Sequence, residues 1–193
     1  MIKKILLVFF VLMVIPSVLQ SASMNDSIKV KDRFMDLKNF AYYVAEKNKW
    51  SLIVGNDISV PIKEVNGDTI KDILDNYCKN SEIGWHFEKN CLYIGDNKAL
   101  NTYFSHLKTL EKSLPNGNNA TYSGYFRNMD FSMLCSSLSS ISGTKIRLAN
   151  NLDANIMMRV NGMPWKRVLL AVVMLNKYKM NVTDFSMLIT PES

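Results

Sequence analysis

The sequence predicts an α+β fold made of two tandem small β-α-β-β-α-β-β domains joined by a helical linker. Two observations lead to this prediction. The apolar pattern of residues 24–95 (copy one) recurs in residues 121–193 (copy two), and in each copy amphipathic helix patterns alternate with short strand-like segments. A composition of 48% hydrophobic and 21% charged residues indicates a folded chain rather than a disordered one.

The repeat is visible as an apolar spacing that runs in step between the copies. Met35–Leu37 aligns with Met129–Phe131 at an offset of 94 residues. One extra residue near Asn155 changes the offset to 95, and Val65–Gly67 then falls on Val160–Gly162. Few aligned residues are identical, so it is the spacing that indicates the duplication.

Each copy contains two helix patterns that are apolar on one face only. Asp36 and Asp130 precede the first pattern of each copy, where a carboxylate can accept the free N–H groups of a first helical turn. Gly143 suits the position just after such a helix, because glycine adopts positive φ readily. The four apolar stripes are Leu37, Phe40, Ala41, Val44; Ile70, Ile73, Leu74, Tyr77; Phe131, Leu134, Cys135, Leu138; and Trp165, Val168, Leu169, Val172.

Short strand-like segments supply the sheet that these helices would cover. They are Ile28–Val30, Ser51–Val54, Ile62–Val65 and the hairpin Trp85–Ile94 in copy one, and Tyr122–Phe126, Lys145–Leu148, Ile156–Val160 and the hairpin Lys179–Ile189 in copy two, with turns near Lys89 and Thr183. An Asn-Gly pair, at 66–67 and 161–162, is a strong hairpin signal. Here a helix pattern follows each pair, and Pro164 suits a first helical turn. We therefore expect strand-to-helix turns at both.

Residues 1–23 have the three parts of a cleaved secretory signal. Lys3 and Lys4 give a basic start, Ile5–Leu19 is uncharged, and Ser21–Ser23 is made of small residues. An uncleaved membrane anchor is the alternative, but this apolar segment is shorter than the roughly 20 residues that a spanning helix needs. We therefore expect export, with cleavage near Ser23.

Residues 96–120 form the linker between the copies. Leu100, Phe104, Leu107 and Leu110 stand at helical spacing, and Pro115–Asn119 has turn composition. The helix could pack on either copy or act only as a spacer.

Copy two resembles a known domain family. Its Lys145–Leu148 and Ile156–Val160 strands lead into Asn161–Trp165, a polar-aliphatic-Pro-Trp step, then an aliphatic helix, a hairpin and the exit Ile189–Pro191. This order is similar to the short N-terminal domain of secretins and TonB-dependent transducers, above all the version in type IV pilus secretins. Copy one has the same layout with Thr69-Ile70 in place of Pro-Trp.

The resemblance implies a periplasmic module of a type IV pilus or type II secretion machine at the outer membrane. Its expected partners are protein subunits of that machine, any membrane association is through those partners, and self-association into a homo-oligomer fits the role. A secretin continues into a membrane barrel, whereas this sequence ends at Ser193, so we expect an accessory protein, a divergent component or a truncated product. The alternative is a signalling domain like that of TonB-dependent transducers.

Enzymatic motifs are missing from the sequence, so no catalytic residue, metal ligand set or cofactor is predicted. His86 and His106 have no partner at a spacing typical of a triad or a zinc site, and phosphate-binding glycine loops are absent. A KH-type RNA-binding unit would need a GXXG loop, which the sequence lacks between its helices. Nucleic acid is therefore not an expected partner.

The three cysteines have different expected roles. Cys78 ends the second helix of copy one and Cys91 opens its last strand, so a disulfide between them is a candidate in an exported chain. It would be worth roughly 3 kcal/mol if unstrained. Cys135 lies on an apolar helix stripe and is expected to be a buried thiol.

Copy two carries most of the excess positive charge, with eight Lys and Arg against four Asp and Glu. Lys145 and Arg147 alternate with apolar residues and so share one face of a strand. Arg159, Lys166 and Arg167 add to the surplus. A merely solvated sheet face is one interpretation, and a face that binds an acidic partner is the other.

Overall fold

The structure of the chain is a computed structural model that describes residues 23–28, 35–62, 69–116, 118–150, 152, 154–184 and 186–192. The expected leader, except its last residue, lies outside this part of the chain. So do Lys29 and Val30 of the first expected strand and residues 63–65 of the third. Ser27 forms an isolated bridge with Thr69. None of the described helices is long and apolar enough to cross a bilayer.

The first helix of each copy begins at its predicted N-cap, and that of copy two also ends at the predicted glycine. The carboxylate of Asp36 accepts a first-turn N–H of α1 (Leu37–Asn48), and that of Asp130 does the same for α4 (Phe131–Ser142). Gly143 follows α4 with a φ of 71°. These three predictions are confirmed. They could be made from the sequence because a cap depends on only a few neighbouring residues.

The second helices begin differently in the two copies. Thr69 and Asp72 form a reciprocal capping box at the start of α2 (Ile70–Cys78). In copy two, α5 (Trp165–Leu175) starts after Pro164, which takes the N-cap position instead of the predicted first turn and offers no side-chain cap.

The expected strand-to-helix turn at residues 161–162 is wrong. Asn161 and Gly162 belong to a strand that continues to Pro164, with Gly162 at a φ of 61°. The neighbouring strand shifts register between Tyr122 and Gly124, so a bulge accommodates the left-handed glycine. The corresponding pair at 66–67 lies outside the described residues.

The strands of the two copies follow the same order. They are β1 (Met35–Asp36), β2 (Ser51–Val54), β3 (Pro61–Ile62), β4 (Ile83–Glu88) and β5 (Cys91–Asp96) in copy one, and β6 (Thr121–Asp130), β7 (Lys145–Leu148), β8 (Asn155–Pro164), β9 (Tyr178–Val182) and β10 (Ser186–Pro191) in copy two. In each copy the first and third strands pair antiparallel, the second and fifth pair parallel, and the last two form a hairpin. The α+β class is confirmed, and the pairing repeats the duplication seen in the sequence.

One strand pair joins the copies into a common sheet. β2 of copy one pairs antiparallel with β8 of copy two, with Leu52 opposite Arg159 and Val54 opposite Met157. The resulting five-stranded sheet has the order β4-β5-β2-β8-β6, while β7-β10-β9 forms a separate three-stranded sheet. The two copies are therefore not two separate sheets, because the pairing of β2 with β8 is a contact between distant segments.

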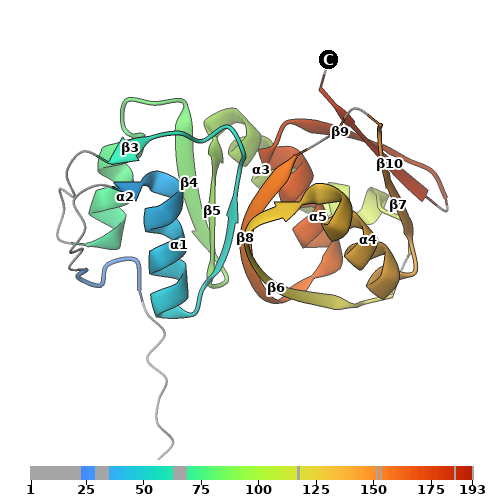
Figure 1. Cartoon of the computed structure of the whole chain (residues 1–193), viewed down its shortest axis with the longest axis horizontal. Coiled ribbons are helices and arrows are strands. Elements are labelled where there is room, and N and C mark those ends of the chain that lie inside the picture. Colours follow the sequence, from blue (N-terminus) through green and yellow to red (C-terminus); the bar gives the residue numbers. More distant parts are fainter. Residues whose placement is uncertain are drawn as a thin grey trace, which may run out of the picture.

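The layers alternate helices and sheets (Figure 1). α1 and α2 cover one face of the five-stranded sheet, and α4 and α5 lie between its other face and the three-stranded sheet. α3 (Asn97–Ser113) lies on that other face too, over β4 and β5 and alongside α5. Two apolar cores result. One contains α1, α2 and alternate residues of β2 and β5, such as Leu52 and Ile94; the other contains α3, α4, α5 and the opposite residues, such as Ile53 and Tyr93.

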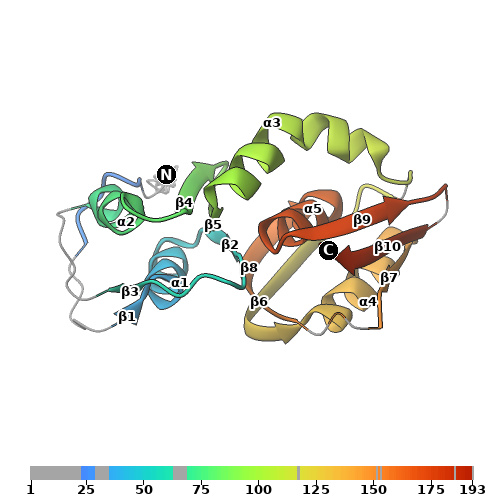
Figure 2. The same ribbon diagram turned by 90° about the horizontal axis from the view of Figure 1, so that it is seen from above.

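The linker helix α3 contacts both copies. It runs from the end of β5 alongside α5 (Figure 2). Tyr103 packs on Tyr93 of β5, while Glu111 forms an ion pair with Arg167 of α5 at 2.8 Å. The linker is thus a packed element that connects the copies rather than a bare spacer.

The proposed disulfide is not formed, since the structure has free thiols at all three cysteines. Cys91 points into the core that α3 covers, whereas Cys78 packs beside the core on the other side of the sheet. Strand alternation at β5 explains the difference, because Leu92 and Ile94 face the α2 side while Cys91 and Tyr93 face the opposite side. Cys135 is buried, as predicted.

Candidate functional site

The outer face of the three-stranded sheet is the most distinctive exposed surface of copy two. Ile146, Met187 and Ile189 point inward and are buried. The residues between them therefore point outward, and Lys145 and Arg147 of β7 are exposed. We call this surface the basic sheet face and define it by Lys145, Arg147, Lys179, Asn181 and Leu188.

An exposed leucine lies at the centre of the basic sheet face. Leu188 of β10 is 41% exposed, and the strand register puts it between Arg147 of β7 and Asn181 of β9. Two residues along β10 in opposite directions, Ser186 lies opposite Lys145 of β7 and Thr190 lies opposite Lys179 of β9. The three strands contain no Asp or Glu, although Glu192 directly follows β10, so the apolar centre is flanked mainly by positive and uncharged polar side chains.

The corresponding face of copy one is covered. Tyr93 occupies the position of Leu188 and is 3% exposed, with its ring 5.6 Å from that of Tyr103 and 5.0 Å from that of Phe104 on α3. Ile53, in the position of Arg147, is fully buried in the same core. One face of the repeated unit is therefore an intramolecular interface in copy one and a solvent-facing surface in copy two.

The exchanged residues explain why no helix in the described part of the chain covers the second face. Ile53 is replaced by Arg147, and Gly84 of β4 is replaced by Lys179. An apolar helix laid over Arg147 would desolvate its guanidinium without supplying a counter-charge, which is strongly unfavourable. The cations of the basic sheet face are therefore favoured either in contact with water or in contact with a partner that supplies carboxylates.

The other predicted basic residues do not join this face. Arg159 lies on β8, where its guanidinium carbon is 4.2 Å from the centre of the Tyr125 ring. Lys166 donates hydrogen bonds of 3.3 Å to the carbonyls of Glu111 and Leu114, and Arg167 pairs with the Glu111 carboxylate. Lys166 and Arg167 hold the end of α3, so the structure brings together only Lys145 and Arg147 of the predicted set.

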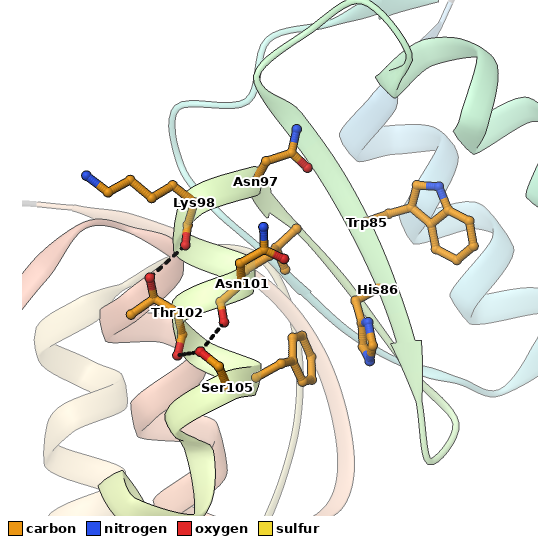
Figure 3. A pocket seen from close by; sticks show the side chains of 9 residues that line it. Trp85, His86, Asn97, Lys98, Asn101, Thr102 and Ser105 are labelled. Atoms are coloured by element: carbon orange, nitrogen blue, oxygen red, sulfur yellow. Dashed lines mark hydrogen bonds between the residues drawn. The ribbon is translucent and has the colours of Figure 1, made fainter.

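A concave surface, with a volume of about 740 Å³, lies elsewhere, between β4 and α3. Figure 3 shows His86 of β4 facing the polar side chains of α3, among them Asn101 and Ser105. The hydroxyl of Ser105 donates to the carbonyl of Asn101, and that of Thr102 to the carbonyl of Lys98. These two hydroxyls hydrogen-bond carbonyls within their own helix. The Ser105 hydroxyl also lies 3.0 Å from Nδ1 of His106, its exposed neighbour on α3, and the same nitrogen lies 3.1 Å from the Thr102 carbonyl. Among the described residues no carboxylate orients this imidazole, so the pair is not arranged as a catalytic triad.

The thiols do not provide a nucleophile either. Burial raises the pKa of Cys91 to about 12, and the same cause raises the pKa of Cys135 to about 12 and that of Cys78 to about 11. A reactive cysteine needs a lowered pKa, because the thiolate is the attacking species. Across the described part of the chain, no group of His, Cys, Asp and Glu is arranged to hold a metal ion.

No family model and no curated protein matches the chain. The candidate site is therefore identified from the geometry of the structure alone. Sequence reasoning found Lys145 and Arg147 from their alternation but missed Lys179 and Leu188. The sequence contains a signal for both residues, because Leu188 aligns with Tyr93 and Lys179 aligns with Gly84 at the offset of 95 residues. A position-by-position comparison of the two copies would have shown that polar residues replace apolar ones on this face of copy two.

Proposed function

We propose that this chain is a non-enzymatic, exported binding module that works in the periplasm as an accessory component of a secretin-based outer-membrane machine. It would hold a neighbouring protein subunit through the basic sheet face. The observation that carries this proposal is the contrast between the copies: a face buried in copy one is exposed in copy two and carries Lys145, Arg147 and Lys179 around Leu188.

The composition of this face suits the recognition of an acidic protein surface. The exposed cations Lys145 and Arg147 attract an acidic partner over about 8 Å at physiological ionic strength. An apolar residue at the centre adds a contact that water cannot replace, and interfaces concentrate their energy at such central residues. Charge would therefore steer the encounter, and Leu188 would stabilise the complex.

The class of machine comes from the resemblance of copy two to secretin N-terminal domains. The order of its elements and the step Asn161–Trp165 support it, and a secretory leader supports the compartment. Domains of this kind bind other subunits and perform no chemistry, which agrees with a face that offers charge and apolar area rather than a catalytic group.

The proposal is tested by crosslinking in intact cells. The chain is expressed with an affinity tag, the envelope is crosslinked, and the captured proteins are identified by mass spectrometry. Secretin, pilus or other outer-membrane components should be enriched, and the double variant Lys145→Glu/Arg147→Glu should lower their recovery at least tenfold.

A charge-matched control separates the face from net charge. Lys47 on α1 and Lys108 on α3 are exposed and lie away from the three-stranded sheet. The variant Lys47→Glu/Lys108→Glu should retain the wild-type recovery. Recovery of no secretion, pilus or outer-membrane component, or equal losses in both double variants, would reject the proposal.

A further inference from the structure

We infer that the basic sheet face is a docking site for an acidic amphipathic helix of the protein partner, seated over β10 as α3 is seated over β5. This inference rests on the proposed function and specifies its partner. The chain itself provides the template, since α3 covers β4 and β5 of copy one, and no helix of the described residues covers the outer face of the equivalent strands β9 and β10.

The template is the contact of α3 with copy one. An apolar stripe of α3, Leu100, Tyr103, Phe104 and Leu107, faces the sheet. Tyr93 stands at the centre of the covered face, and Phe104 also contacts the ring of His86 on β4, with 3.8 Å between the ring centres. A single helix thus covers neighbouring strands of this unit by stripe-on-sheet packing.

The residues at the equivalent positions of copy two define what a docking helix must carry. Leu188 replaces Tyr93 and offers an apolar centre, so the helix needs a stripe of apolar residues spaced i, i+3, i+4, i+7. Arg147 and Lys179 replace Ile53 and Gly84 on either side. The helix therefore needs an Asp or Glu on the side of its stripe that lies over Arg147, since a buried cation is tolerated only when paired.

Charge also excludes a second copy of α3 as the occupant. The sequence of α3 carries Lys98, Lys108 and Lys112 against a single acidic residue, Glu111, which is already paired with Arg167. A basic helix would be repelled by the basic sheet face. The occupant is therefore a different chain.

Addition of a strand at the edge of β7 is disfavoured. In copy one, the equivalent edge of β2 pairs with β8. In copy two, the N–H of Ile146 donates to the hydroxyl of Ser139 on α4 at 3.0 Å, a side chain that Ala45 lacks at the same position of α1. An edge amide that is already satisfied is a poor template for another strand, which leaves the face as the surface for docking.

A peptide titration tests the inference. The probe is a 17-residue peptide with the sequence of α3 in which Lys98, Lys108 and Lys112 are replaced by Glu, and the control peptide keeps the lysines. Each is added to the ¹⁵N-labelled protein at low ionic strength. The acidic peptide should shift the amide signals of β7, β9 and β10 and bind at least tenfold more tightly than the control peptide.

Variants of the face confirm the location. Leu188→Asp should abolish binding of the acidic peptide without unfolding the protein, because the side chain is already exposed, and Lys145→Glu should weaken it at least threefold. Absence of binding, equal affinity for the two peptides, or signal changes confined to other elements would overturn the inference.

A photo-crosslinking amino acid at position 188 in the full chain distinguishes this inference from the proposed function. A crosslink to an acidic helical segment of an envelope component supports both. A crosslink to a loop or strand of such a component overturns the helix but leaves the proposed function standing. Crosslinking from the control position 133 on α4, where Met133 is 61% exposed, but none from position 188, would overturn both.

Discussion

Replacement of Gly55 by alanine probes the contact that fixes the two copies against each other. Gly55 follows β2, and its N–H donates to the carbonyl of Ile94 on β5. A Cβ atom at Gly55 would lie 2.6 Å from the carbonyl oxygen of Leu175, the last residue of α5. The side chain of Leu175 covers Gly95 of β5 in the same way. The end of α5 is therefore held against two strands of copy one.

The expected loss of stability follows from the kind of atom that is contacted. A backbone carbonyl at the end of a packed helix cannot rotate away, so either α5 or β2 must shift. Overpacking of this kind costs about 1–3 kcal/mol, and the lower entropy of the unfolded alanine variant returns about 0.4–1 kcal/mol. We expect a net loss of about 1–2 kcal/mol, which corresponds to roughly 2–8 °C in Tm for a chain of this size.

The assay is urea denaturation of the wild type and Gly55→Ala, with Gly84→Ala as the matched control. A Cβ at Gly84 would meet the amide oxygen of Asn97, but Asn97 is exposed and its side chain can move into solvent. Gly84→Ala should therefore change the free energy of unfolding by less than about 0.5 kcal/mol. Equal stability of Gly55→Ala and the wild type would refute the close packing of α5 on copy one.

Three further predictions follow from individual contacts. Trp165→Phe removes a buried indole N–H that donates to the carbonyl of Asn118 at 2.9 Å, and should cost about 1–3 kcal/mol by urea denaturation. Asp96→Ala removes the N-cap of α3 and should cost about 0.5–2 kcal/mol at pH 7. Burial alone would raise the pKa of Asp96, but hydrogen bonds from backbone amides and the Lys177 ammonium outweigh it and lower the pKa. The charge-dependent part of the difference should therefore be fully present above about pH 5 and be lost as the pH falls below about 4. Without reductant, the denatured protein should show three titratable thiols.

Each of these predictions has an outcome that contradicts it. An unchanged midpoint for Trp165→Phe would mean that the Asn118 carbonyl is satisfied without the indole. A constant stability difference for Asp96→Ala between pH 7 and pH 3 would show that the carboxylate charge plays no part. A mass increase of the alkylated protein after reduction would reveal a disulfide.

Local features were predictable from the sequence, whereas contacts between distant segments were not. Asp36, Asp130 and Gly143 were identified as caps because capping involves only the adjacent turn. The pairing of β2 with β8 could not be predicted, because partner choice among strands depends on the whole fold. The prediction of a disulfide between Cys78 and Cys91 was wrong for the same reason, since the face to which a strand residue points is known only once the sheet and its register are known.

The candidate site was predictable in part. Lys145 and Arg147 alternate with apolar residues, and this local pattern placed them on an exposed strand face. Lys166 and Arg167 are also basic, but α3 covers them, and the position of a linker helix relative to both copies is not encoded in the spacing of its own residues. Leu188 was missed because an exposed leucine in a hairpin pattern looks like a core residue.

The central claim is that the basic sheet face binds an acidic partner, and the salt dependence of that binding tests it most directly. The component captured by crosslinking would be purified and titrated with the wild type and with Lys145→Glu/Arg147→Glu at 50 and 300 mM NaCl. We predict that the wild type binds at least tenfold more weakly at the higher concentration, and that the variant binds weakly at both. Equal affinities of the two proteins, or a wild-type affinity independent of salt, would contradict the claim.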